Sequence, residues 1–316
     1  MASGSKKVIL AALIGNSLIS VTKFIAAGIT GSAAMMSEGI HSLVDTGNQG
    51  LLLYGLKRAK RPADERFPFG HGKEIYFWSF VVAILIFAVG AGISIYEGIH
   101  HVLHPTPAGD PTINYIVLGL ALIFEGWAWW MALKEFQKIK GTSGYFEAVR
   151  EGKDPTVFVV LFEDSAAMLG LIVAGLGVGL TQLTGNPVWD GMASIAIGLI
   201  LGGTAVWLAF ETKSLLIGEA ASPEMVKTIG DMSSKIDTVE NVNEVLTLHM
   251  GPEFILVNIS LDFADGSSAA EVEQAIESLD QGIRQRYPLV RRIFVEAESR
   301  EHAGEAPAAD PPGAPA

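Results

Sequence analysis

Six apolar runs, each about as long as a membrane-spanning helix, constrain this chain more than any other feature. A helix needs roughly 20 consecutive apolar residues to cross the hydrocarbon core of a bilayer. The chain is 49% hydrophobic and only 18% charged, against about 25% charge in an ordinary soluble domain. We therefore predict an α-helical, multi-pass integral membrane protein in a lipid bilayer. Its six predicted transmembrane helices cover residues 8–29, 33–56, 75–101, 113–134, 156–182 and 189–211.

Basic residues alternate between the two sides of the predicted membrane. The loops 28–32, 104–111 and 184–187 contain no lysine or arginine, whereas the N-terminus and the other loops contain several. Lysine and arginine accumulate on the cytosolic side of membrane proteins. We therefore expect both termini in the cytosol, and a location in a bacterial inner (cell) membrane. The residues that set this orientation are Lys6, Lys7, Lys57, Arg58, Lys60, Arg61, Arg66, Lys138, Lys140, Arg150 and Lys153.

The composition changes after Phe210, where long apolar runs give way to short amphipathic segments. Ser222 precedes Pro223, which is a typical start for a helix, here to about residue 236. Two strands, 242–250 and 254–263, flank a Gly-Pro turn. A second helix from Ser267 or Ser268 to about Arg286 and a third strand at 290–295 complete the pattern αββαβ.

This pattern predicts a small cytosolic α/β domain of the ferredoxin-like class. We assign residues 1–211 to a transmembrane transport domain, 212–222 to a linker and 223–299 to the cytosolic domain. The tail, residues 300–316, is rich in proline and alanine and is expected to be disordered.

The second apolar run contains ionisable residues that a lipid-facing helix would not tolerate. His41 and Asp45 are four residues apart and share a helical face, and Glu38 lies on nearly the same face. Imidazole and carboxylate together suit Zn²⁺ and neighbouring transition metals. The bland alternative is a polar hydrogen bond between helices. A histidine and two acids at membrane depth are costly, however, and favour a metal site.

The fifth apolar run carries the adjacent acids Glu163 and Asp164. Neighbouring residues of a helix point about 100° apart, so only one of the two can face the second helix directly. We expect Asp164 to contribute to the metal site. Glu163 serves either as a further ligand or as a structural group.

The run His41-Ser-Leu-Val-Asp45, the loop from Pro62 to Glu74, the six spans and the terminal αββαβ domain together resemble the cation diffusion facilitator family. The segments around His41 and around Asp164 are most similar to its zinc transporter nine-like branch. The similarity covers residues 8–298. The resemblance implies a homodimer that exports a divalent metal ion in exchange for protons.

The chain also departs from the family pattern, in which two ligands four residues apart on the second helix meet two more on the fifth. His41, Asp45 and Asp164 match, but Val160 stands where the fourth ligand is expected and cannot bind metal. The resemblance leaves Glu38, Glu163, Asn48 or a water molecule as the replacement. In the loop, His71 matches a family histidine that in some members belongs to a second metal site, whereas Phe67 stands where another is common.

We therefore predict a secondary active transporter, not an enzyme, that exports a divalent transition-metal ion, with zinc favoured. Metal binds only deprotonated ligands, so protons at the outer face would release it. Export of Mn²⁺, Fe²⁺, Co²⁺ or Ni²⁺, or a role as a membrane metal sensor or scaffold, are the alternatives. A net charge of −12 argues against nucleic acid. The chain has no cysteine and therefore no thiolate site, and we expect no prosthetic group.

Overall fold

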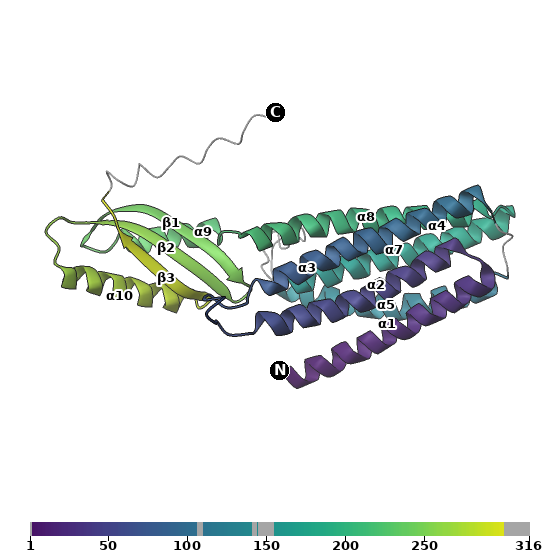
Figure 1. Cartoon of the computed structure of the whole chain (residues 1–316), viewed down its shortest axis with the longest axis horizontal. Coiled ribbons are helices and arrows are strands. Elements are labelled where there is room, and N and C mark those ends of the chain that lie inside the picture. Colours follow the sequence, from purple (N-terminus) through teal and green to yellow (C-terminus); the bar gives the residue numbers. More distant parts are fainter. Residues whose placement is uncertain (1, 106–109, 141–143, 145–154, 300–316) are drawn as a thin grey trace, which may run out of the picture. The chain divides into compact units, whose positions relative to one another are not determined.

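The computed structural model of the chain describes residues 2–105, 110–140, 144 and 155–299 (Figure 1). It separates into two compact units, Met1–Leu216 and Ile217–Ala316, which we treat one at a time. The predicted disordered tail, residues 300–316, lies outside the described residues, as do Arg150 and Lys153.

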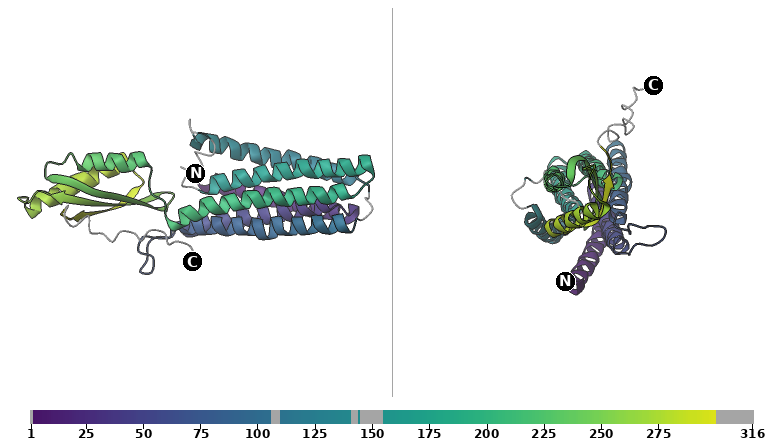
Figure 2. Two further views of the ribbon diagram at one scale, coloured as in Figure 1. Left: turned by 90° about the horizontal axis from the view of Figure 1, so that it is seen from above. Right: turned by 90° about the vertical axis from the view of Figure 1, so that its left-hand side faces the viewer.

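The first unit consists of long helices that run alongside one another (Figure 2). Short turns at Gly31 and Gly185, both with φ of 69°, reverse the chain between successive helices. The segment from Glu74 to Leu103 is continuous but contains a π-helical stretch, η1. The elements are α1 Ala2–Thr30, α2 Ala33–Ala59, α3 Glu74–Leu85, η1 Ile86–Ala91, α4 Gly92–Leu103, α5 Thr112–Lys140, α7 Pro155–Thr184 and α8 Val188–Ile217.

Four helical segments within the described residues are long and apolar enough to cross a membrane. They are Glu74–Leu103, Thr112–Gln137, Phe158–Thr184 and Val188–Ile217. Helix α2 has a comparable length of 27 residues, but it carries three ionisable groups in its middle and two basic residues in its last turn. Its polar residues are buried against neighbouring helices, which is how membrane proteins accommodate such groups.

Helix α2 lies in the middle of this unit and packs against α1, α3, α4 and α7. Helices α4 and α8 approach closely because glycines stand where they meet. A Cβ atom added at Gly98 would lie 2.7 Å from the carbonyl oxygen of Gly191, and one at Gly198 would lie 2.6 Å from Ile95. Any larger side chain at either position would push the two helices apart, as at other small-residue contacts in membranes.

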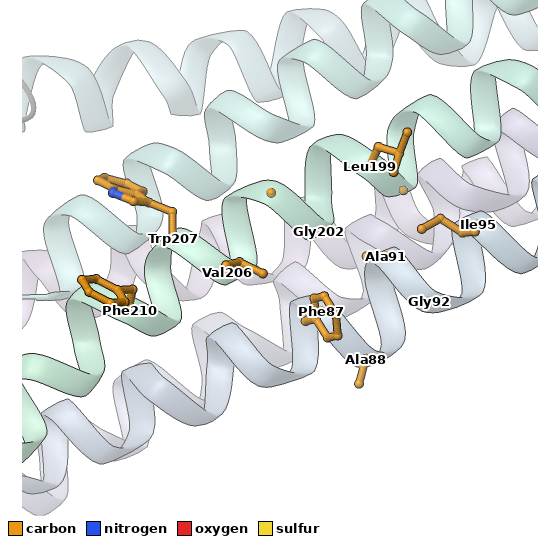
Figure 3. Close-up of a pocket in the computed structure, with 12 residues that line it drawn as sticks. Phe87, Ala88, Ala91, Gly92, Ile95, Leu199, Gly202, Val206, Trp207 and Phe210 are labelled. Atoms are coloured by element: carbon orange, nitrogen blue, oxygen red, sulfur yellow. The ribbon is translucent and has the colours of Figure 1, made fainter. Parts of the chain in front are cut away.

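An apolar groove of about 780 Å³ runs between the η1 segment and α8 (Figure 3). Phe87, Ala88 and Ala91 line one wall, while Val206, Trp207 and Phe210 line the other. Glycines 198, 202 and 203 also line it. Among the described residues, no ionisable group lines the groove, so its chemistry matches lipid chains and other apolar surfaces.

The second unit contains α9 Pro223–Ser233, β1 Val239–Gly251, β2 Phe254–Phe263, α10 Ala269–Arg286 and β3 Val290–Ala297. This is the order of elements that the sequence predicts. The side chain of Ser222 caps α9 by accepting from Met225 N. Ser268, rather than Ser267, caps α10 and forms a capping box with Glu271.

The sheet has the order β1-β2-β3, with β1 antiparallel and β3 parallel to the central strand β2. Alternate residues of β2, namely Ile255, Val257, Ile259 and Leu261, are buried. They form one core with Ile229 of α9 and with Leu279 and Ile283 of α10. The unit is therefore a two-layer structure in which helices cover one face of a three-stranded sheet.

Helix α8 ends at Ile217, six residues beyond the predicted boundary of the transmembrane domain at 211. The fall in hydrophobicity after Phe210 suggested an earlier end. However, residues 212–217 contain no glycine or proline, and the helix continues until Gly218, whose φ is 130°. Glycine adopts this conformation readily and ends helices for that reason.

Candidate functional site

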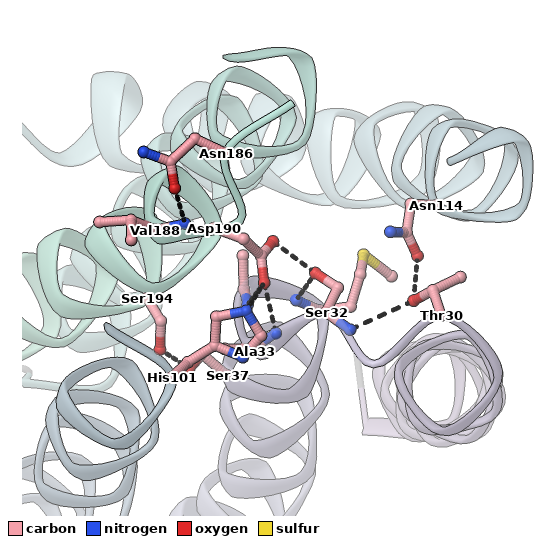
Figure 4. Close-up of polar contacts among 12 residues, drawn as sticks. Thr30, Ser32, Ala33, Ser37, His101, Asn114, Asn186, Val188, Asp190 and Ser194 are labelled. Carbon is pink, nitrogen blue, oxygen red and sulfur yellow. Dashed lines mark hydrogen bonds and ion pairs between the residues drawn. The ribbon is translucent and has the colours of Figure 1, made fainter. Parts of the chain in front are cut away.

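Helix α2, which carries most of the candidate residues, is anchored at its N-terminus by Asp190 of α8 (Figure 4). The Asp190 carboxylate accepts from the Ser32 hydroxyl at 2.6 Å and from the backbone amides of Ala33 and Ala34 at 2.5 and 3.3 Å. Ser32 itself caps α2 by accepting from Met35 N. A buried carboxylate thus satisfies amides that the first turn of a helix leaves without partners.

A second group of buried polar contacts extends this anchor (Figure 4). The hydroxyls of Ser37 on α2 and Ser194 on α8 lie 2.6 Å apart, and Ser194 also donates to the carbonyl of Ser94 on α4. His101 Nε2 on α4 lies 3.9 Å from Asp190. These contacts fix α2, α4 and α8 to one another at the end of α2 where the helix begins.

One turn further along α2, His41 and Asp45 are buried, with exposed fractions of 1% and 8%. His41 Nδ1 lies 3.3 Å from Asp45 Oδ1. The contact does not have hydrogen-bond geometry, so both ring nitrogens and this oxygen lack a hydrogen-bond partner among the described residues. A buried imidazole is normally satisfied, and one that is not is available as a ligand.

Glu163 on α7 faces this pair from the neighbouring helix. Its Oε1 accepts a hydrogen bond of 2.6 Å from Asn48 Nδ2, one turn beyond Asp45. Asp45 and Glu163 also lie within hydrogen-bonding reach of each other. Two carboxylates can approach this closely inside a protein only with a proton or a cation between them. Asp45 of α2 therefore contacts both His41 of the same helix and Glu163 of α7.

Asp164, the next residue of α7, is half-buried. It interacts electrostatically with the carboxylates of Glu163, Glu125 and Asp45. Val160, one turn before it, packs against the apolar core and offers no ligand atom. No three histidine or acidic side chains within the described residues converge on one point to form a preformed metal cluster. The residues are linked in pairs instead.

Glu38 does not join His41 and Asp45, although all three belong to α2. Its Oε2 accepts from the Nζ of Lys23 on α1 at 3.0 Å, and that ammonium also donates to Glu125 Oε1 of α5 at 2.7 Å. Lys23 and Glu125 were not among the residues predicted from the sequence. The available signal was the presence of one basic and one acidic residue near the middle of otherwise apolar runs, because opposite charges at membrane depth usually pair.

His71 lies apart from these residues in the sequence, in the loop after α2, and its contacts are satisfied there. Its Nε2 lies 2.9 Å from Asp64, and its Nδ1 lies 2.9 Å from Glu74, which Arg58 also contacts at 2.8 Å. The two carboxylates approach opposite edges of the imidazole, so one metal ion could not bind all three groups in this arrangement.

The contact with His71 is also visible in the acidity of its partner. The hydrogen bond from His71, together with the backbone amides of Phe67 and Arg66, holds the pKa of Asp64 below its ordinary value. The contact therefore stabilises the loop above the ordinary pKa of aspartate and is lost as the pH falls through the lowered value.

Comparison with known proteins shows which family the chain belongs to. A family model described as the cation efflux transmembrane domain matches residues 9–217. The chain belongs to the cation efflux family. This confirms the resemblance drawn from the motifs around His41 and Asp164, and it makes the chain a multi-pass membrane protein.

Several cation efflux relatives share most of the chain. The mouse and human proteins named proton-coupled zinc antiporter SLC30A9, mitochondrial, are 35% and 34% identical over 263 and 285 residues, which is 82% and 89% of this chain. These segments are 46% and 50% of the relatives, so the chain spans about half their length. The cation-efflux pump FieF of Escherichia coli is 26% identical over 280 residues, 88% of either chain.

A plant member of the cation efflux family, metal tolerance protein C4 of Arabidopsis thaliana, is 29% identical over 261 residues, 82% of this chain and 57% of the relative. The names of these relatives describe an antiporter, a tolerance protein and a pump. They support a transporter rather than an enzyme.

Proposed function

We propose that this protein exports a divalent transition-metal ion, with zinc favoured, in exchange for protons. The observation that carries this proposal is the buried imidazole of His41 beside Asp45, which has no hydrogen-bond partner in the described part of the chain, with the carboxylate of Glu163 facing Asp45 from α7. A nitrogen ligand together with anionic oxygen ligands, buried in a membrane helix, suits a borderline-soft divalent ion such as zinc. The names of the SLC30A9 relatives support zinc and proton coupling.

The ligand set that we propose is His41, Asp45, Asp164 and Glu163, with Asn48 as the residue that orients Glu163. Zinc takes four such nitrogen and oxygen ligands in tetrahedral geometry. Glu38, which the sequence left open as a ligand, is held by Lys23 instead and is the weaker candidate. Because three of the four ligands are oxygens, Mn²⁺, Fe²⁺, Co²⁺ and Ni²⁺ remain the alternative cargo ions.

Proton exchange follows from the same residues. When no metal is bound, the facing carboxyl groups of Asp45 and Glu163 require a shared proton, and His41 is available to take another. Metal binds only the deprotonated forms, so its entry from the cytosol releases protons. Protons that enter from the other side restore the first state and release the metal. The proposed cycle therefore couples one ion to protons without any covalent step.

The experiment that tests this function uses purified protein in liposomes with a zinc-sensitive dye inside and an imposed proton gradient. We expect zinc to accumulate on the acidic side and protons to leave as it enters. Mn²⁺, Fe²⁺, Co²⁺, Ni²⁺ and Cd²⁺ are compared in the same vesicles. Zinc flux that ignores the proton gradient would contradict antiport, and no flux of any of these ions would contradict transport altogether.

We further propose that α1 and α2 cross the membrane with the four apolar segments, giving six spans with both termini in the cytosol. The basic residues around positions 6–7 and 57–66 support this orientation. Because the chain has no cysteine, single cysteines report topology without background. We expect a membrane-impermeant maleimide to label a cysteine at the exposed position of Thr184 (Thr184→Cys), but not Gly266→Cys, from outside intact cells. The opposite labelling pattern would reverse the orientation.

Three finer assignments stay predictions. The homodimer follows from the family resemblance, and the ferredoxin-like class from the αββαβ order. The expected bacterial cell membrane contrasts with the mitochondrial location in the names of the SLC30A9 relatives, whereas the FieF relative comes from a bacterium.

A further inference from the structure

Three helices of the first unit meet at a single buried ammonium group. Lys23 of α1 has no exposed side-chain surface. Its Nζ donates to Glu38 Oε2 at 3.0 Å, to Ser42 Oγ at 2.8 Å and to Glu125 Oε1 at 2.7 Å. An ammonium has three donors, and here each has its own oxygen acceptor. The carboxylates and the hydroxyl therefore surround Lys23 as ligands surround a cation.

The charges of this cluster do not balance. Glu38 and Glu125 contribute two negative charges, and Lys23 contributes one positive charge, which leaves one negative charge in excess when all are ionised. Glu38 Oε1 and Glu125 Oε2 are buried and have no hydrogen-bond partner among the described residues. Buried oxygens of this kind are costly. The cluster therefore presents more ligand atoms than the ammonium uses.

The space next to Glu38 is shaped for its carboxylate. A Cβ atom added at Gly170 of α7 would collide with Glu38 Oε1. Glycine at this position thus leaves room for the oxygen between α2 and α7. The carboxylate is held in place by backbone shape on one side and by Lys23 on the other.

We infer that Glu38, Glu125 and Ser42 form a second cation site, separate from His41, Asp45 and Glu163, and that the side chain of Lys23 is its resident cation. The site offers only oxygen ligands, which favour hard divalent ions such as Mn²⁺ and Mg²⁺. Because the ammonium is tethered to α1, its effective concentration is high and diffusible ions are excluded. Lys23 thereby leaves the bundle with one exchangeable ion. The distinction between the two sites rests on the proposed function.

Removing the ammonium is the direct test of this inference. Lys23→Ala leaves two buried carboxylates without their counter-ion, and a buried acid stripped of its partner either takes up a proton or captures another cation. A purely structural ion pair predicts only lower stability. A cation site predicts a new bound ion, which the variant would gain in place of the lost side chain.

The experiment measures Mn²⁺ bound per chain by electron paramagnetic resonance, using the full chain in detergent. Asp45→Asn serves as the parent, because it silences the proposed transport site. We expect Asp45→Asn/Lys23→Ala to bind one more Mn²⁺ per chain than the parent. Adding Glu125→Gln should weaken that new binding at least tenfold. The matched control is Asp45→Asn/Lys134→Ala, which removes an exposed lysine of α5 instead. It should bind no more Mn²⁺ per chain than the parent.

A folded double variant that binds no more Mn²⁺ than its parent would overturn the inference. If the double variant is unstable, its melting temperature is followed with increasing Mn²⁺, since a ligand of the folded state stabilises it. A rise that the control variant does not show supports the site, and no rise contradicts it. These readouts need no transport. Failure of the proposed function would appear separately, as zinc flux in Asp45→Asn that equals the flux of the wild-type protein.

Discussion

Replacement of Asp45 by asparagine is expected to abolish zinc transport, lowering the initial rate in liposomes by about 100-fold or more. Even partners of metal ligands cost roughly 10–100-fold when changed, and Asp45 is proposed as a ligand itself. Asp45 both contacts His41 and faces Glu163. Asparagine keeps the shape of the side chain but removes the charge that offsets dehydration of a divalent ion.

The matched control for this change is Asp265→Asn, which removes an exposed carboxylate from the loop between β2 and α10. Both variants should elute and melt close to the wild-type protein, because asparagine keeps the shape of the Asp45 side chain and its amide can donate a hydrogen bond to the facing carboxylate of Glu163. The control should transport at the wild-type rate. Zinc flux above half the wild-type rate in Asp45→Asn would mean that the transport site lies elsewhere.

Glu163→Gln is expected to lower zinc transport by about 10–100-fold, with most of the effect on the KM for zinc, whereas Glu38→Gln should change that KM only a few-fold. The structural reason is that Glu163 faces Asp45, while Glu38 is held by Lys23. Glutamine at position 38 can still accept a hydrogen bond from the ammonium. The two variants are compared by rate against zinc concentration in the same liposomes.

The comparison decides which acid replaces the ligand missing at Val160. If Glu38→Gln raises the KM for zinc more than Glu163→Gln does, Glu38 is the ligand and our assignment is wrong. Val160→His adds a third variant to the series. By restoring the imidazole of the family pattern, it should favour zinc over Mn²⁺.

Much of the fold could be predicted because its signals are local. Long apolar runs predict the helices of the first unit, and Gly31 and Gly185 mark the turns between them. In the second unit, Ser222 and Ser268 begin the two helices, and alternation along β2 gives the buried face of the sheet. These features depend on neighbours within a few residues, which a single sequence contains in full.

The candidate site was harder to predict because a shared helical face is not a shared neighbourhood. Glu38 and Asp45 are seven residues apart and point in nearly the same direction, but they lie about 10 Å apart along the helix axis. The charged neighbours at the level of Glu38 are Lys23 of α1 and Glu125 of α5, whereas at the level of Asp45 the facing acid is Glu163 of α7. Only the packing of helices far apart in sequence shows that Lys23 pairs with Glu38 and not with Asp45.

The anchor between Asp190 and the first turn of α2 makes that helix a lever with a fixed end. At 1.5 Å per residue, Asp45 lies about 18 Å and Ala59 about 39 Å from Ala33, the first residue of α2. A tilt of about 5° around the anchor would therefore move Asp45 by about 1.6 Å and Ala59 by about 3.4 Å. Metal–ligand bonds tolerate only about 0.2 Å. A tilt this small would separate the ligands of α2 from those of α7 while the contacts of Ser32 and Asp190 stay closed.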